Sequence, residues 1–174
     1  MLDKYSRYRV LRVFLDSPIE NFGLREISRL SKLSPPSVSE YLEEFESKGL
    51  ITKTEKKGNP SYQASRENED FIFYKKLGIL YELQNSGLTE HLWQKLSPDA
   101  IILYGSYAKG ESVENSDIDL FIMGKEKQIN LEEFEKKLNR SIHLIFGSNT
   151  KNISKELTNN LVNGIILKGY FKVF

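Results

Sequence analysis

Residues 104–123 read YGSYAKGESVENSDIDLFIM, and this stretch decides the fold of the C-terminal half of the chain. The run AIILYG at 100–105 is apolar enough to form a buried strand, and the glycine and serine after it predict a tight turn into a helical stretch. DIDLFIM at 117–123 predicts a second strand. The sequence therefore predicts two strands that bracket a turn rich in polar groups.

The turn carries residue types that bind phosphate. Gly105 lets the chain turn and approach a ligand closely, and Ser106 can donate to a phosphate oxygen. Lys109 follows about one helical turn later, where its ammonium group can reach a triphosphate, and Gly110 breaks the helical phase. A turn of this kind is a weak signal alone, so its assignment to nucleotide binding depends on the residues that follow.

Asp117 and Asp119 strengthen the assignment. Spaced two apart on a strand, they point to the same face, while Ile118 and Leu120 point into the core. Neighbouring carboxylates repel each other unless a cation lies between them, and Mg²⁺ takes such oxygen ligands while bridging to substrate phosphates. The alternative is a solvated edge strand whose acidic face discourages pairing. The preceding glycine–serine turn favours the metal site.

Together the two motifs resemble those of the nucleotidyltransferase superfamily, most closely the minimal nucleotidyltransferases of bacteria and archaea, with their GSxAxG loop followed by SDIDL. The resemblance covers residues 98–174, with GIILKG as the closing segment. It implies an α/β domain with a small mixed sheet. It also implies an NTP substrate, with ATP expected, and Mg²⁺ or Mn²⁺ held by Asp117 and Asp119.

One position departs from that family. Active members carry a third carboxylate on the next strand, where it helps to bind a second metal and deprotonates the attacking hydroxyl. The corresponding segment, SIHLI, places His143 there. A neutral imidazole can ligate a metal or act as a general base, but it is a poorer Mg²⁺ ligand than a carboxylate. Three interpretations follow: His143 replaces the carboxylate, full catalytic competence is lost, or another carboxylate fills the role.

The first 66 residues predict three helices followed by a hairpin. Ser34 is suited to cap the third helix, Pro35 to begin it and Gly49 to end it. LITKTEK and SYQAS then flank the turn KGNP and predict two short strands. This order resembles the winged helix-turn-helix domains of prokaryotic transcription regulators, so the chain is expected to be an α+β protein with such a domain at its N-terminus.

The resemblance implies double-stranded DNA as a partner. The N-terminal half of the recognition helix, 34–48, offers hydroxyls rather than arginine, so phosphate contacts outweigh base readout. The expected DNA-binding residues are Arg25, Arg29, Lys32, Ser34, Ser37, Ser39, Lys53, Lys56 and Lys57. A winged helix can equally bind protein, and that alternative stays open.

Residues 67–97 are expected to form a helical linker, interrupted by Gly87 and closed by Ser97 and Pro98. They either join two domains, with a dimerisation surface as a further role, or are simply more core. The bulk composition adds little: residues 1–66 carry 12 Lys and Arg against 9 Asp and Glu. The chain has no cysteine, which excludes thiolate chemistry, and no targeting or membrane segment is seen, so a cytoplasmic location is expected.

Three functions are compatible with these features. The first is an active enzyme that transfers NMP to a protein or nucleic-acid hydroxyl, with Asp117, Asp119 and His143 as its catalytic groups. In the minimal family such activity is associated with antitoxins that adenylylate a HEPN-type toxin. The second is a DNA-binding regulator whose nucleotidyltransferase domain is a nucleotide sensor or a scaffold. The third is an antitoxin that neutralises its partner by binding alone. A homodimer fits each of them.

Overall fold

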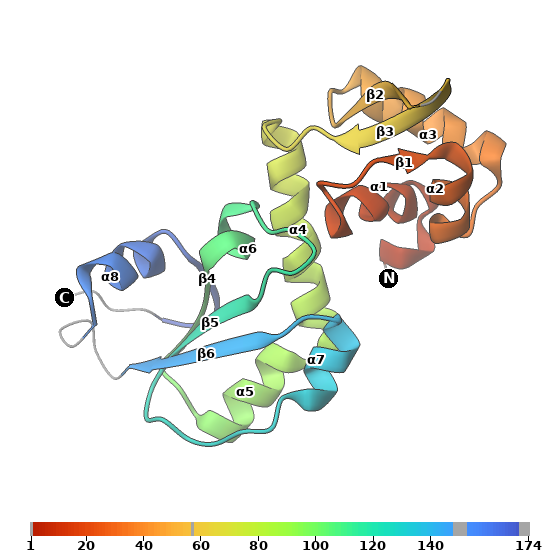
Figure 1. The fold of residues 1–174 in the computed structure, drawn as a ribbon. Helices are drawn as coiled ribbons and strands as arrows, with labels where there is room; N and C mark the ends of the chain where they lie inside the picture. Colours follow the sequence, from red (N-terminus) through yellow and green to blue (C-terminus); the bar gives the residue numbers. More distant parts are fainter. Residues whose placement is uncertain (1, 57, 148–152, 171–174) are drawn as a thin grey trace. The chain divides into compact units, whose positions relative to one another are not determined.

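The computed structural model describes residues 2–56, 58–147 and 153–170, and the chain divides into two compact units, Met1–Lys75 and Lys76–Phe174. The first unit begins with a 3-10 turn, η1 (Leu2–Lys4). It continues with α1 (Ser6–Asp16), β1 (Phe22–Gly23), α2 (Leu24–Ser31), α3 (Pro35–Ser47), β2 (Ile51–Lys56) and β3 (Asn59–Ala64) (Figure 1). The three strands form an antiparallel sheet in the order β1-β3-β2.

The helix α3 has the boundaries that the sequence predicts. Pro35 occupies its first position, and Gly49 follows it with a φ of 68°. The backbone N–H of Leu50 donates to the carbonyl of Phe45 at 2.9 Å, which closes the helix with a left-handed glycine. Ser34 lies at the N-cap, but its hydroxyl contacts that of Ser37 at 3.0 Å rather than a backbone N–H.

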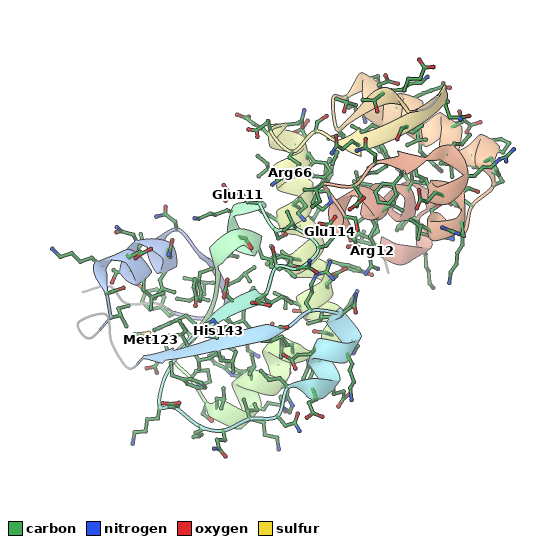
Figure 2. The ribbon with its side chains drawn as sticks, in the orientation of Figure 1. Arg12, Arg66, Glu111, Glu114, Met123 and His143 are labelled. Atoms are coloured by element: carbon green, nitrogen blue, oxygen red, sulfur yellow. The ribbon has the colours of Figure 1, made fainter. Side chains whose placement is uncertain are left out.

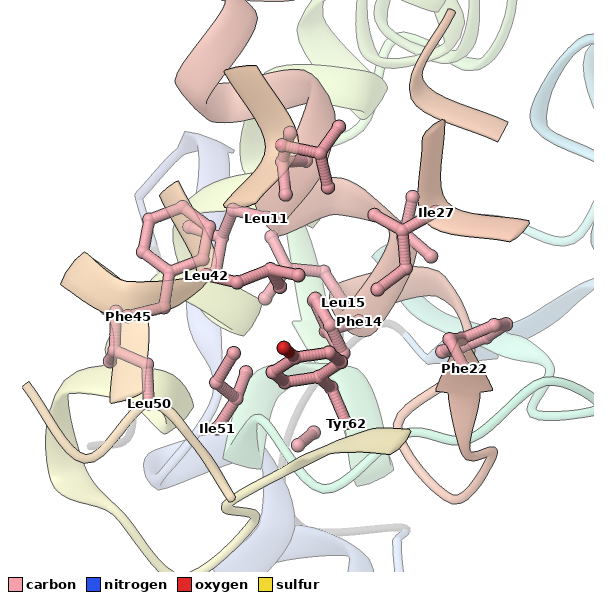
Figure 3. Packing of buried hydrophobic residues seen from close by; sticks show 14 of the residues in the cluster. Leu11, Phe14, Leu15, Phe22, Ile27, Leu42, Phe45, Leu50, Ile51 and Tyr62 are labelled. Atoms are coloured by element: carbon pink, nitrogen blue, oxygen red, sulfur yellow. The ribbon is translucent and has the colours of Figure 1, made fainter. Parts of the chain in front are cut away.

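One buried hydrophobic cluster holds the first unit together. Phe14 and Phe22 meet edge to face with ring centroids 5.8 Å apart, which joins α1 to β1. Figure 3 shows these rings with the side chains that α2, α3 and the hairpin add to the cluster, among them Ile27, Phe45 and Tyr62. Each helix of this unit therefore has one face buried against the small sheet.

The second unit is built on a four-stranded mixed sheet. After α5 (Leu88–Leu96) the chain forms β4 (Ala100–Tyr104), α6 (Gly105–Lys109), β5 (Ile118–Met123), α7 (Glu132–Leu138), β6 (Ile142–Gly147), α8 (Lys155–Val162) and β7 (Ile165–Gly169) (Figure 1). The strand order is β6-β5-β4-β7. The β5–β6 pair is parallel, whereas β4 pairs antiparallel with both β5 and β7.

The two faces of this sheet pack against different helices. Alternate residues of β4 and β5, such as Leu103 and Leu120, share a cluster with Leu92 of α5. The other face, which includes Tyr104 and Phe121, packs against Leu161 of α8. The mixed sheet that the sequence predicts for this half of the chain is therefore present, and helices line both of its faces.

The stretch 67–97, which the sequence predicts to be a helical linker, is helical and contributes to both units. It forms α4 (Glu69–Ser86) and α5, with Gly87 in a left-handed conformation between them. Phe71 of α4 belongs to the hydrophobic cluster of the first unit, whereas Ile79 and Leu83 belong to that of the second. Apolar residues along one helix thus serve two cores, and α5 lies wholly within the second unit.

Among the described helices, none has both the length and the apolar composition needed to cross a membrane.

Candidate functional site

The turn after β4 is tight, and α6 starts without an intervening loop. Gly105 has a φ of 71°, which favours glycine, and it is already the first residue of the helix. Gly110 ends α6 with a φ of 78°. The N–H of Glu111 donates to the carbonyl of Ser106 at 2.9 Å and so closes the end of this short helix. The two glycines that the sequence assigns to the phosphate loop therefore set its two ends.

Asp119 lies directly against this turn. In the β4–β5 pairing it is the partner of Tyr104, one residue before Gly105. A Cβ added to Gly105 would lie 2.3 Å from Oδ2 of Asp119, far closer than two such atoms can approach. The absence of a side chain at Gly105 therefore makes room for the carboxylate, in addition to permitting the turn.

His143 lies on β6, the strand next to β5 (Figure 2). His143 and Asp119 are partners in the parallel β5–β6 register, and Nδ1 of His143 is 3.4 Å from Oδ1 of Asp119. The imidazole is 60% exposed and the carboxylate 26% exposed. The structure thus brings together the aspartate and the histidine that the sequence assigns to catalysis, with one carboxylate oxygen facing Gly105 and the other facing the ring.

Asp117 has a different setting from the one that the sequence predicts. It is exposed and precedes β5, which begins at Ile118, so the two aspartates do not both belong to the strand. A turn comes just before it, where the N–H of Val113 donates to Oγ of Ser116 at 2.8 Å. Among the described residues, no group of three or more His, Asp or Glu side chains is arranged to hold a metal ion. The two donors that the paired strands hold together are therefore Asp119 and His143.

Tyr104 is a neighbour of the site that sequence reasoning missed. Burial and, to a smaller extent, the nearby Asp119 carboxylate raise the pKa of its phenol to about 12. The hydroxyl therefore stays protonated and neutral over the physiological range. The signal that could have revealed it is the register of the two strands, which pairs Tyr104 with Asp119 but is not a local property of the sequence.

The remaining residues of the predicted phosphate loop lie on α6. Ser106 is half-buried in its first turn, and Lys109 is exposed at its last position. Tyr107, between them, is buried, and its hydroxyl accepts a hydrogen bond from Nε of Arg140 at 2.8 Å. This hydrogen bond joins α6, which carries Ser106 and Lys109, to the segment that leads into β6, the strand of His143.

The cations predicted to bind DNA are placed in the first unit. Arg25 and Arg29 on α2, Lys32 at its C-cap and Lys53 on β2 are all exposed, and Arg29 approaches Glu26 at 4.0 Å. Ser34 is exposed, while Ser37 and Ser39 are half-buried on α3. Lys57 lies outside the described residues, as does the side chain of Lys56. Exposed cations thus follow one helix and one strand of this unit.

Comparison with known proteins supports the fold of the second unit. The family model described as polymerase beta, nucleotidyltransferase matches residues 87–168, from the glycine before α5 to β7. No curated protein and no solved structure matches the chain. The strand order, the glycine turn and the aspartate beside it therefore stand in a domain with a nucleotidyltransferase fold. The match includes α5, in agreement with the packing of this helix against β4.

Proposed function

We propose that the chain binds an NTP with a divalent metal ion and transfers the NMP group to a hydroxyl of a protein or nucleic acid. A nucleotidyltransferase-like function in general is supported by the match over residues 87–168. The observation that carries the specific proposal is the contact of Asp119 with both Gly105 and His143 at the end of β4. A carboxylate is here held against a glycine–serine turn through one oxygen and beside an imidazole through the other.

The donor set fits a divalent metal. Asp119 is partly exposed, with Oδ1 facing His143, and Asp117 is exposed two residues earlier. Such a pair, completed by water and substrate phosphates, is a usual environment for Mg²⁺ or Mn²⁺. When bound, the ion would neutralise charge that develops on the transferring phosphoryl group. We assign Asp117 and Asp119 as its protein ligands.

The remaining groups position the substrate and receive a proton. Ser106 and Lys109 would contact the phosphates from α6, with Gly105 permitting their close approach. The acceptor hydroxyl attacks the α-phosphorus, the bond to the β-phosphate oxygen breaks, and pyrophosphate leaves with its electron pair. His143 stands beside Asp119, and its exposed ring can either ligate the metal or take the proton of the attacking hydroxyl.

A second proposal concerns the first unit, which we assign to double-stranded DNA binding. Helix, short strand, two helices and a hairpin is the element order of a winged helix-turn-helix, with α3 as its recognition helix. The exposed cations of α2 and β2 support phosphate contacts, and the serines at the start of α3 support weak base readout. For the nucleotidyltransferase activity we further propose ATP as the nucleotide and a HEPN-type toxin as the partner. We also propose that the chain forms a homodimer.

One observation favours a second candidate function. With His143 where active family members carry a carboxylate, the site has one negative charge fewer to offset two metal ions. A DNA-binding regulator or antitoxin that uses the domain as a nucleotide sensor or scaffold would need binding but no transfer. We therefore separate binding from catalysis in the experiment that tests the proposal.

The purified full chain is titrated with ATP and Mg²⁺ or Mn²⁺ in a calorimeter, and is then incubated with labelled ATP in the presence of cell lysate. Metal-dependent binding that is lost in Asp119→Asn, together with label transferred to a macromolecule, is the expected result. Nucleotide binding without transfer of label would favour the nucleotide-sensor function. If a His143→Asp variant then gains transfer activity, the chain is an enzyme that has lost its third carboxylate. If ATP, GTP, CTP and UTP all fail to bind with either metal, the proposal is wrong.

A further inference from the structure

His143 and Asp119 present two different donor atoms at a spacing that suits one metal ion. Nδ1 of His143 and Oδ1 of Asp119 are 3.4 Å apart. Two ligands at about 2.1 Å from a metal are roughly 3.0 Å apart at an octahedral right angle and roughly 3.4 Å apart at a tetrahedral angle. A single ion can therefore contact both atoms with little movement of either side chain.

The contact is poor as a direct hydrogen bond. Bonds between a ring N–H and a carboxylate are typically about 2.7–2.9 Å long, so 3.4 Å leaves the pair only weakly joined. The ring is 60% exposed, and neither burial nor a tight bond commits its Nδ1 to Asp119. Both donors are thus accessible to an ion that arrives from solvent.

The backbone fixes which oxygen of Asp119 takes part. Oδ2 lies against the Cα of Gly105, in space that any larger residue would fill. Oδ1 is left to face His143 across the parallel pairing of β5 with β6. Because both residues lie within paired strands, their spacing is set by the sheet rather than by a loop. The pair therefore provides two preformed ligands of a coordination sphere.

We propose that His143 is a direct ligand of the metal and gives the site a preference for Co²⁺, Zn²⁺ or Mn²⁺ over Mg²⁺. The inference rests on the metal site proposed above and adds its selectivity. Mg²⁺ favours an all-oxygen, strictly octahedral environment, whereas imidazole is a favourable ligand for first-row transition ions. A nitrogen donor in place of the third carboxylate therefore weakens the binding of Mg²⁺ and preserves the binding of transition-metal ions.

The test uses the histidine content of the chain, which is two residues, His143 and His91. The full chain labelled with ¹⁵N is titrated with Zn²⁺ in the presence of a non-hydrolysable ATP analogue, and the imidazole nitrogens are followed by NMR. Nδ1 of His143 is expected to move to the shift of a metal-bound nitrogen. His91, which lies on α5 beside the ring of Phe134, serves as the internal control and should not move.

Affinities provide the second readout. Calorimetry with Co²⁺ and Mg²⁺ is expected to show Co²⁺ binding at least about tenfold more tightly in the wild-type chain, and His143→Asp is expected to bring the two ions closer together. His91→Gln is the matched control and should leave the ratio unchanged. Metal binding that depends on Asp119 without any shift at His143 would overturn this inference and leave the proposed function standing. Absence of metal-dependent nucleotide binding with every ion would overturn both.

Discussion

Gly105 meets two demands that only glycine satisfies together. Its φ of 71° lies in the left-handed region, which costs an L-residue roughly 1–2 kcal/mol. Its missing side chain is replaced in space by Oδ2 of Asp119, 2.3 Å from where a Cβ would be. The first demand concerns the stability of the turn, and the second concerns the position of a proposed metal ligand. The two effects can be separated by comparing glycines.

Gly105→Ala is expected to displace the Asp119 carboxylate and abolish metal-dependent nucleotide binding, while the domain stays folded. Gly87→Ala is the matched control, because Gly87 also has a positive φ of 81° but nothing within 4 Å of its added Cβ. Both variants should lower the free energy of unfolding by roughly 1–2 kcal/mol. Calorimetric titration and thermal unfolding are the measurements. If Gly105→Ala binds the nucleotide as tightly as Gly87→Ala does, the contact with Asp119 has no role in binding.

Individual site residues differed in how far the sequence predicted them. Gly105 and Asp119 stand in a local motif, so their spacing alone indicates a turn and a carboxylate strand. The position of His143 followed only from comparison with a family pattern, and the β5–β6 register is what places it beside Asp119. Tyr104 was missed, since its raised pKa depends on burial and on a cross-strand neighbour. Local chemistry was predictable, whereas contacts between strands were not.

The helix α2 presents its cations in a regular arrangement. Arg25, Arg29 and Lys32 are spaced four and three residues apart, which places them along one side of a helix and its C-cap, and all three are exposed. Lys53 adds an exposed cation on β2. The ion pair between Arg29 and Glu26 is 4.0 Å long and solvent-exposed, so it is weak competition for a phosphate. This arrangement belongs to the proposed DNA interface.

Replacing Arg25, Arg29 and Lys53 together by glutamine is expected to weaken binding to a mixed-sequence duplex and to flatten its dependence on salt. Each phosphate that the protein no longer neutralises lowers the slope of log K against log salt by about 0.9. Fluorescence anisotropy over a salt series measures both. A control variant with Lys95, Lys125 and Lys136 replaced by glutamine removes the same charge from exposed positions of the second unit and should bind normally. Equal weakening in both variants would indicate a purely global charge effect.

Most elements could be predicted from periodicity and breakers, but the pairing of the strands could not. Gly49 and Pro35 marked the limits of α3 correctly, because glycine and proline impose local backbone geometry. The two-residue strand β1 was not predicted, since it exists only through its pairing with β3. The pairing of β7 with β4 joins segments about sixty residues apart and includes an irregularity between Ile101 and Ile102. No short window of sequence contains that information.

At the scale of the whole molecule, the chain has separate hydrophobic cores that share one helix. Phe71 near the start of α4 lies in the core of the first unit, while Leu83 near its end lies in that of the second. The sequence alone does not show this sharing, because an apolar helix has the same pattern whichever core it packs against. The division at Lys75 reflects packing rather than composition.

Phe14→Ala is expected to destabilise the first unit selectively. Phe14 is fully buried, and removing such a ring typically costs about 3–5 kcal/mol. The single tryptophan, Trp93, is partly buried and packs against the core of the second unit, so its fluorescence reports on that unit. On heating, circular dichroism should show a loss of helix at a lower temperature than in the wild type. The unfolding transition followed by Trp93 fluorescence should keep its midpoint temperature. Coincident transitions, both shifted to lower temperature, would mean that the two units unfold as one.

The close approach of Gly105 and Asp119 also has a consequence for the history of this domain. An alanine at position 105 would displace the carboxylate, so the aspartate keeps its proposed place only while the glycine is kept. A relative without the proposed metal site would be released from both constraints at once. In a set of relatives, positions 105 and 119 should therefore change together. A relative that keeps the glycine but lacks the aspartate would represent an intermediate stage in the loss of that site.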